Sequence, residues 1–172
     1  MEIALVKIGT MRFSRVQYYT VRKVIDEEPL KPEFIDFLHR MGTTEQDRTE
    51  LSEINKYIEQ IGQLYGALPQ HFKKEDAAER LPPPYHEFIS TDAPDDFGLR
   101  LYCIRLSPAI VILLNGDRKT ALKVKDCKNC YRHFDFARKL SLKIDQAIQD
   151  GILEVDNERK EILVEDDFVL TI

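Results

Sequence analysis

Basic side chains cluster around the most apolar segment of the chain, AIVILLNG at residues 109–116. The cations that we expect to contact phosphate are Arg100, Arg105, Arg118, Lys119, Lys123 and Lys125. Arginine offers two parallel N–H donors to a phosphate, and a tyrosine such as Tyr102 can stack on a base. The same cluster would stabilise charge on a phosphate during transfer, which makes its cations catalytic candidates. The alternative is that these cations form salt bridges to the acidic parts of the chain.

A hairpin of two strands would bring these side chains together. Residues 98–107 (GLRLYCIRLS) and 109–116 both look like strands, and a tight Ser-Pro connection joins them. Side chains alternate between the faces of a strand, so Arg100 and Tyr102 share a face that Arg105 does not. Because a hairpin pairs the start of one strand with the end of the next, we expect Arg100 and Tyr102 to lie beside Asn115, Arg118 and Lys119.

His133 is the candidate general acid or base, because it is the histidine of the basic region. An unperturbed histidine titrates near neutrality, which suits that role. The alternative is an inert surface histidine. The sequence contains no nucleophile elbow, phosphate-binding glycine loop or dinucleotide fingerprint.

Cys127 and Cys130 precede His133 at a spacing that occurs in zinc sites, and Cys103 would be the fourth ligand. A single C-x2-C is also the spacing of a redox pair, or of two cysteines that simply pack at the start of a helix. We favour packing, and we predict no metal and no cofactor. Three cysteines do not make a disulfide framework, so we expect a reducing, cytoplasmic location.

The elements that must position these residues follow from hydrophobic periodicity. The sequence predicts strands at 3–8 and 16–24, helices at 32–41 and 43–66, strands at 98–107 and 109–116, a helix at 131–151, and two short strands about a D-N-E-R turn. Between them we expect residues 67–96 to be irregular, with at most a short helix at 73–80. Strands and helices in blocks favour an α+β fold with an antiparallel sheet and helices packed on it.

Length and charge indicate one domain over residues 1–151 with an acidic extension over residues 152–172. The net charge is −5, but residues 97–143 hold eleven Lys or Arg against three Asp or Glu, whereas residues 144–172 hold two against nine. This asymmetry indicates a polyanion-binding middle region. The extension either folds over the basic face or adds strands to the sheet edge. No apolar run is long enough for a membrane span, and we expect no membrane partner.

The segment GLRLYCIRLSPAIVILLNGDRKT, followed by a basic segment that leads into a helix, resembles the core of RelE/ParE-type toxins, in particular the HigB-like, phage-derived branch. The piece YYTVRKVIDEEPLKPEFIDFLHRM resembles the first strand and helix of that family. The resemblance covers about residues 16–150. It departs from the family in being longer, acidic overall, and extended by an N-terminal strand and a C-terminal hairpin.

This resemblance implies a strand, two helices, an antiparallel sheet and a final helix, in a toxin of a type II toxin–antitoxin system. Many members cleave mRNA on the ribosome, where basic residues orient a phosphate for attack by a ribose 2′-hydroxyl, whereas ParE-like members poison gyrase. By position, the mRNA-facing residues would be Arg100, Arg105, Arg118, Lys119, Lys123, and Tyr131 or His133. The resemblance also implies an antitoxin partner. The alternative is a non-catalytic interaction module that keeps the fold, and buried, acid-paired Arg100 and Arg118 would favour it.

Overall fold

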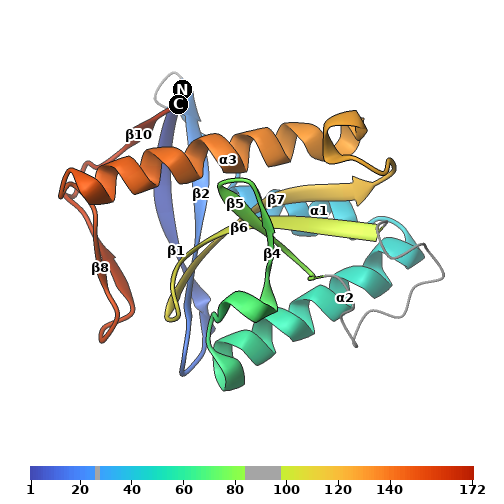
Figure 1. Ribbon diagram of the computed structural model, residues 1–172, viewed down its shortest axis with the longest axis horizontal. Coiled ribbons are helices and arrows are strands. Elements are labelled where there is room, and N and C mark those ends of the chain that lie inside the picture. The colour runs from blue at the N-terminus through green and yellow to red at the C-terminus, as the bar shows by residue number, and fades with distance from the viewer. Residues whose placement is uncertain (26–27, 84–97) are drawn as a thin grey trace.

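The computed structural model describes residues 1–25, 28–83 and 98–172, and these form an α+β fold (Figure 1). The elements are β1 (Glu2–Arg12), β2 (Gln17–Ile25), β3 (Glu28–Pro29), α1 (Glu33–Met41), α2 (Glu45–Gln60), β4 (Lys73–Glu75), β5 (Ala78–Leu81), β6 (Gly98–Ser107), β7 (Ile110–Lys119), α3 (Lys128–Gln149), β8 (Glu154–Asp156), β9 (Glu161–Leu163) and β10 (Leu170–Thr171). A π-helical turn, η1 (Ile61–Tyr65), continues α2. Two 3₁₀ turns are η2 (Pro69–His71) and η3 (Val124–Asp126).

The eight-stranded main sheet has the order β10-β1-β2-β7-β6-β5-β4, and β3 pairs with β2. Its pairs are antiparallel except where Gln17–Tyr19 of β2 run parallel to Ile110–Ile112 of β7. The prediction of an antiparallel sheet is therefore correct for most pairs and wrong at its centre. The reason is connectivity. The segment between β2 and β7 contains α1, α2 and further strands, and it is long enough to cross over the sheet and return in the same direction.

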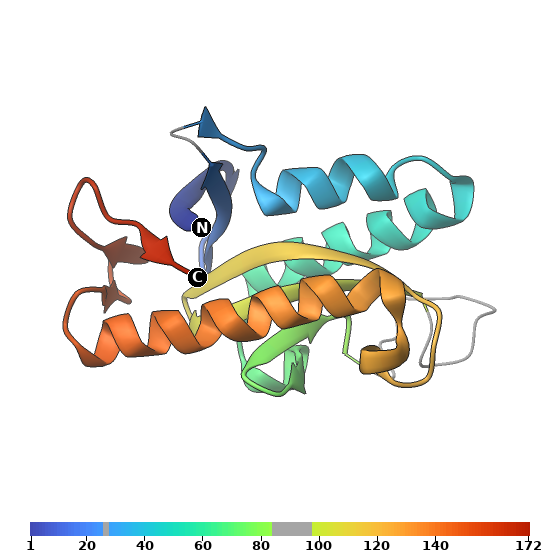
Figure 2. The same ribbon diagram turned by 90° about the horizontal axis from the view of Figure 1, so that it is seen from above.

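Helices cover both faces of the sheet, with α1 and α2 on one side and α3 on the other (Figure 2). One apolar cluster includes Phe34 and Ile58 from the α1–α2 layer and Leu101 from β6. A second cluster includes Tyr102 from β6 and Leu140 from α3. Because the first half of β7 is buried on both faces, residues 110–114 (IVILL) are an unbroken apolar run and do not alternate.

The predicted elements occur close to their expected limits, with one error. The strands at 98–107 and 109–116 form the β6–β7 hairpin, and the helix predicted at 131–151 begins three residues earlier, at Lys128. The short helix at 73–80 is wrong, because this segment forms the β4–β5 hairpin and β5 adds to the edge of β6. Sheet pairing outweighs the helical preference of alanine, glutamate and arginine there. Residues 84–96 of the expected irregular segment lie outside the described residues.

The acidic extension packs at the end of α3 away from η3 (Figure 1). The β8 and β9 strands form a separate two-stranded sheet, and Lys7 of β1 pairs with Glu161 of β9 at 3.1 Å. The last strand, β10, pairs with the first residues of β1, where Ile3 lies opposite Leu170. The extension therefore adds to the sheet edge and does not cover the basic region.

Candidate nucleic-acid interface

Arg118 lies at the end of β7 and points at α2. Its Nη2 is 2.5 Å from Asp47 Oδ1 and 2.5 Å from Glu50 Oε2, and its Nε donates to Asp47 at 3.0 Å. Glu50 also accepts a hydrogen bond from the backbone N–H of Leu99, the residue opposite Arg118 in β6. The guanidinium therefore fastens β7 and β6 to α2, and its donors are directed at carboxylates inside the protein.

Arg100 and Tyr102 lie on the other face of the sheet, under α3, and both are buried. The ring of Tyr102 packs 6.0 Å from that of Phe134, centroid to centroid. The positive charge of Arg100 acts on the thiol of Cys130 at the start of α3. The expectation that Arg100 and Tyr102 lie beside Arg118 is wrong, because the sheet separates them. Neither presents its side chain to an RNA at the surface.

The other two strand cations are also held within the protein. Arg105 forms a bidentate ion pair with Glu79 of β5, at 3.1 and 3.2 Å, and its guanidinium stands over the ring of Phe72. As predicted, Arg105 faces away from the side of β6 that carries Tyr102. Lys119 is buried, with 7% of its surface exposed. Neither cation is placed for a first encounter with a polyanion.

Arg40 of α1 is the centre of a polar cluster at the C-terminal half of β7, and we call it the Arg40 cluster. Its Nε donates to Asp36 Oδ2 at 2.8 Å, its Nη1 to Asp117 Oδ2 at 2.9 Å, and its Nη2 to Asn115 Oδ1 at 2.6 Å. Asn115 in turn donates to Asp36 and to Glu33, at 3.0 and 2.9 Å. Burial raises the pKa of Asp36, but the hydrogen bonds from Asn115 and Arg40 outweigh it, so the pKa lies below its usual value. These contacts join α1 to β7.

His133 is a hydrogen-bond acceptor within this cluster. Its Nε2 lies 3.1 Å from Nε of Arg132 and 3.5 Å from Nη2 of Arg40. Burial and the positive charges of Arg40 and Arg132 lower the pKa of His133 to about 3. The imidazole is therefore neutral at physiological pH with Nε2 unprotonated, so it has no proton to give from that atom. This does not fit the role of general acid.

Cys127 is the residue that precedes α3 and Cys130 lies in its first turn, and the side chains of both are directed at the end of β7. The sulfur of Cys127 accepts from the backbone N–H of Thr120 at 3.4 Å, and that of Cys130 donates to Asp117 O at 3.4 Å. Burial raises the pKa of Cys127, but hydrogen bonds from Thr120 and Cys130 outweigh it and bring the pKa to about 7. Burial raises the pKa of Cys130 well above its usual value. The pair is thus one acidic thiol beside one that stays protonated.

The zinc arrangement considered for these cysteines does not form. Cys103 belongs to the apolar cluster beneath α1 and α2, whereas Cys127 and Cys130 belong to the cluster beneath α3. The Nε2 atom of His133 lies within hydrogen-bond distance of two arginines, Arg132 and Arg40. Across residues 1–25, 28–83 and 98–172, no group of three or more histidine, cysteine, aspartate or glutamate side chains is arranged to hold a metal ion.

Exposed cations remain around η3 and the first turns of α3. This surface consists of Lys123, Lys125, Lys128, Tyr131 and Arg132, and we call it the α3 basic surface. Arg132 has 67% of its side chain exposed and lies 3.9 Å from Asp117. Within the described part of the chain, none of the three lysines forms an ion pair. Cations beside an exposed aromatic ring suit contact with phosphates and bases.

The sequence reasoning placed Lys123, Lys125 and Tyr131 on a nucleic-acid surface but did not include Lys128 and Arg132. The missed signal is helical spacing, because Lys128 and Arg132 are four residues apart and so share a helix face. The Arg40 cluster was also missed. Its local signal is confined to α1, where Glu33, Asp36 and Arg40 lie three and four residues apart, since its other members come from β7 and α3.

Comparison of the chain with known proteins gives no match to a family model, to a curated protein or to a solved structure. Among the helices in the described ranges, none has the length and apolar character to cross a membrane. The family resemblance of the central segment accordingly stays a hypothesis.

Proposed function

We propose that this chain is a non-catalytic RNA-binding module that keeps the RelE/ParE-type fold and contacts RNA through the α3 basic surface. The location of Arg100, Arg118 and His133 carries the proposal. Arg100 is buried under α3, Arg118 is directed at Asp47 and Glu50, and His133 accepts hydrogen bonds from arginines. Side chains with such internal contacts stabilise the fold, whereas catalysis of phosphoryl transfer requires acidic, basic or cationic side chains that point at the substrate.

The order of elements supports the family part of the proposal. A strand (β2), two helices (α1 and α2), an antiparallel set (β5, β6 and β7) and a final helix (α3) follow one another, which is the order that the family resemblance implies. The strands β1, β3, β4 and β8–β10 are additions to that order. The family resemblance implies an antitoxin and the ribosome as partners. It also implies cleavage of mRNA, and our proposal does not include that activity.

The α3 basic surface supports the RNA part of the proposal. Its lysines are exposed and, among described residues, without acidic partners, so their charge is available to phosphates. A chain with net charge −5 would repel RNA over most of its surface, which directs RNA to this end of α3.

The binding test uses a fluorescent single-stranded RNA of about twenty nucleotides and anisotropy at several salt concentrations. We expect Lys123→Glu/Lys125→Glu/Lys128→Glu to weaken binding at least about tenfold and to reduce the slope of log Kd against log salt by about two, or about 0.7 for each lost phosphate contact. Tyr131→Ala should weaken binding without changing that slope.

The matched control reverses three exposed lysines elsewhere, Lys56→Glu/Lys73→Glu/Lys74→Glu, so that net charge changes equally. Equal losses in both triple variants would refute a specific surface. For the absence of catalysis, wild-type protein is induced in a bacterial host and mRNA integrity is followed. Intact mRNA is expected, and mRNA cleavage that Arg118→Ala/Lys119→Ala relieves would overturn this part of the proposal.

A further inference from the structure

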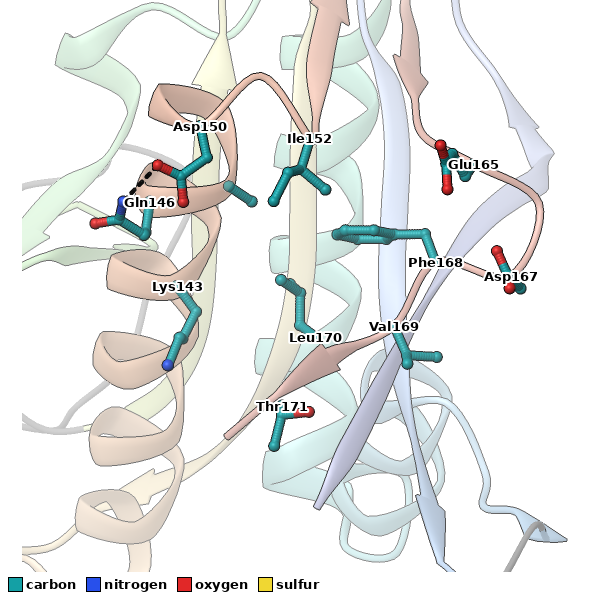
Figure 3. A pocket seen from close by; sticks show the side chains of 11 residues that line it. Lys143, Gln146, Asp150, Ile152, Glu165, Asp167, Phe168, Val169, Leu170 and Thr171 are labelled. Carbon is teal, nitrogen blue, oxygen red and sulfur yellow. Dashed lines mark hydrogen bonds between the residues drawn. The ribbon is translucent and has the colours of Figure 1, made fainter.

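A groove lies between the end of α3 and the C-terminal strand (Figure 3), and this end of α3 is the one away from the α3 basic surface (Figure 1). It has a volume of about 450 Å³ and is lined by the last turns of α3 and by residues 165–171. A second hollow of about 500 Å³ lies against β9 and shares Ile152, Glu165 and Phe168 with the first. The two hollows therefore adjoin at Ile152, Glu165 and Phe168, and we call them together the groove.

Three large apolar side chains in or beside the groove are exposed to solvent. Ile152 is 54% exposed, Val169 is 41% exposed and Leu163 is 40% exposed. Their neighbours Leu170 and Ala147 are buried, so the core is already closed beneath them. In Figure 3 the side chains of Ile152, Phe168 and Leu170 line the space between the helix and the C-terminal strand. These exposed side chains offer a partner apolar surface that it could remove from water.

Carboxylates surround this apolar floor. Asp150, Glu165 and Asp167 line the first hollow, Glu154 lines the second, and Lys143 is the one lysine or arginine among the residues that line them. Asp150 accepts a hydrogen bond from Gln146 at 2.8 Å. With respect to residues 1–25, 28–83 and 98–172, none of these four acids forms an ion pair. The negative charge at the rim is therefore not neutralised within the described chain.

We propose that this groove docks a basic amphipathic segment of a partner protein, with apolar side chains over Ile152 and Val169 and Lys or Arg side chains against the carboxylates. Such a segment removes the apolar floor from water and supplies the missing cations, whereas RNA and anionic lipid would be repelled by the rim. This site is separate from the α3 basic surface, so the inference goes beyond the proposed RNA binding and does not depend on it.

The chain itself presents a segment of partly similar composition. Leu122 is exposed and precedes Lys123 and Lys125 at the opposite pole, so a second copy is the competing occupant. Such contacts would be head-to-tail and would grow without closing, which does not give a defined dimer. A partner segment fills the groove once and leaves the α3 basic surface free, and we commit to that occupant.

The test uses the full chain and a fluorescent synthetic helix of about sixteen residues, with leucine at helical spacing and lysine at the other positions. We expect binding that weakens at least about tenfold in Ile152→Ser/Val169→Ser and in Glu165→Lys/Asp167→Lys. Leu142→Ser removes an equally exposed leucine from α3, and Glu158→Lys reverses an exposed charge in the β8–β9 turn, so both serve as controls that keep wild-type affinity.

Two further peptides separate the contributions, one with glutamate for lysine and one with serine for leucine, and neither should bind. Several outcomes overturn the inference. They are no binding of the first peptide at about 1 mM, equal losses in groove and control variants, or binding of all three peptides. Self-association in sedimentation that Glu165→Lys/Asp167→Lys abolishes would assign the groove to a second copy and overturn the partner segment. RNA affinity, measured in parallel, should be the same in all groove variants.

Discussion

Replacement of Arg118 by methionine tests whether this arginine holds the fold together. Methionine keeps an apolar chain of similar length, so the change mainly removes the positive charge and its hydrogen bonds. The Arg118 side chain is 24% exposed, and its partners Asp47 and Glu50 are 15% and 5% exposed. Removing one partner of a fully buried pair costs about 3–5 kcal/mol, whereas an exposed pair contributes about 0–1 kcal/mol. For this intermediate burial we expect a loss of about 2–3 kcal/mol.

The assay is urea unfolding at neutral pH, with the free energy of unfolding compared between variants. Arg132→Met is the matched control, because Arg132 is mostly exposed, and it should change stability by less than about 0.5 kcal/mol. Glu50→Gln added to Arg118→Met should restore about 1 kcal/mol, since it removes one of the two carboxylates that lost their cation. An Arg118→Met protein as stable as wild type would refute the structural role.

Three other outcomes follow from the site. The imidazole of His133, followed by NMR, should stay neutral down to about pH 4 because its pKa is about 3, and a midpoint near 6.5 would contradict the site geometry. This pKa lies below that of histidine in the unfolded chain. The stability that neutral His133 contributes is therefore fully present above pH 6.5 and declines as the pH falls toward 3. The thiolate of Cys127, which is buried, followed by its ultraviolet absorbance in the folded protein, should form with a midpoint near pH 7 and shift upward in Cys130→Ala; an unshifted midpoint argues against hydrogen bonding to the thiolate. Gly116→Ala should destabilise the protein by more than about 3 kcal/mol, because the new Cβ would lie 1.7 Å from the carbonyl oxygen of Arg100; near-native stability would show that the pairing of β6 with β7 is different.

The sequence predicts the helices and the β6–β7 hairpin because their signals are local. Apolar residues at helical spacing define α1 and α2, and glycines follow α1 at Gly42 and the end of η1 at Gly66. The β4–β5 hairpin has no such signal, since its residues favour a helix and only the pairing of β5 with β6 makes them a strand. The parallel contact of β2 with β7 depends on how distant segments close the sheet, which no short pattern specifies.

The candidate site was harder to predict because its partners are distant in the chain. Arg118 is separated from Asp47 and Glu50 by 71 and 68 positions, so its ion pairs cannot be recognised from the basic run around it. Charge clustering predicts a basic region here, and of its cations Lys123 and Lys125 are exposed. Whether a strand cation is exposed depends on which face of the sheet it lies on and on the helix that covers that face. Arg118 lies on the face that α2 covers, so it pairs with acids of α2 and not with solvent.

The charges at the two ends of α3 have the same sign as the helix dipole at that end. The first turn of α3 holds no acid and begins at Lys128, its last turn holds no base, and Asp150 follows as the C-terminal cap. Cations near a helix N-terminus and anions near its C-terminus each cost about 0.3–1 kcal/mol, so this arrangement weakens the helix at both ends. An anion at the first turn and a cation at the last would reverse both costs. The 22-residue helix therefore depends on the burial of its apolar face, and not on its terminal charges, for its stability.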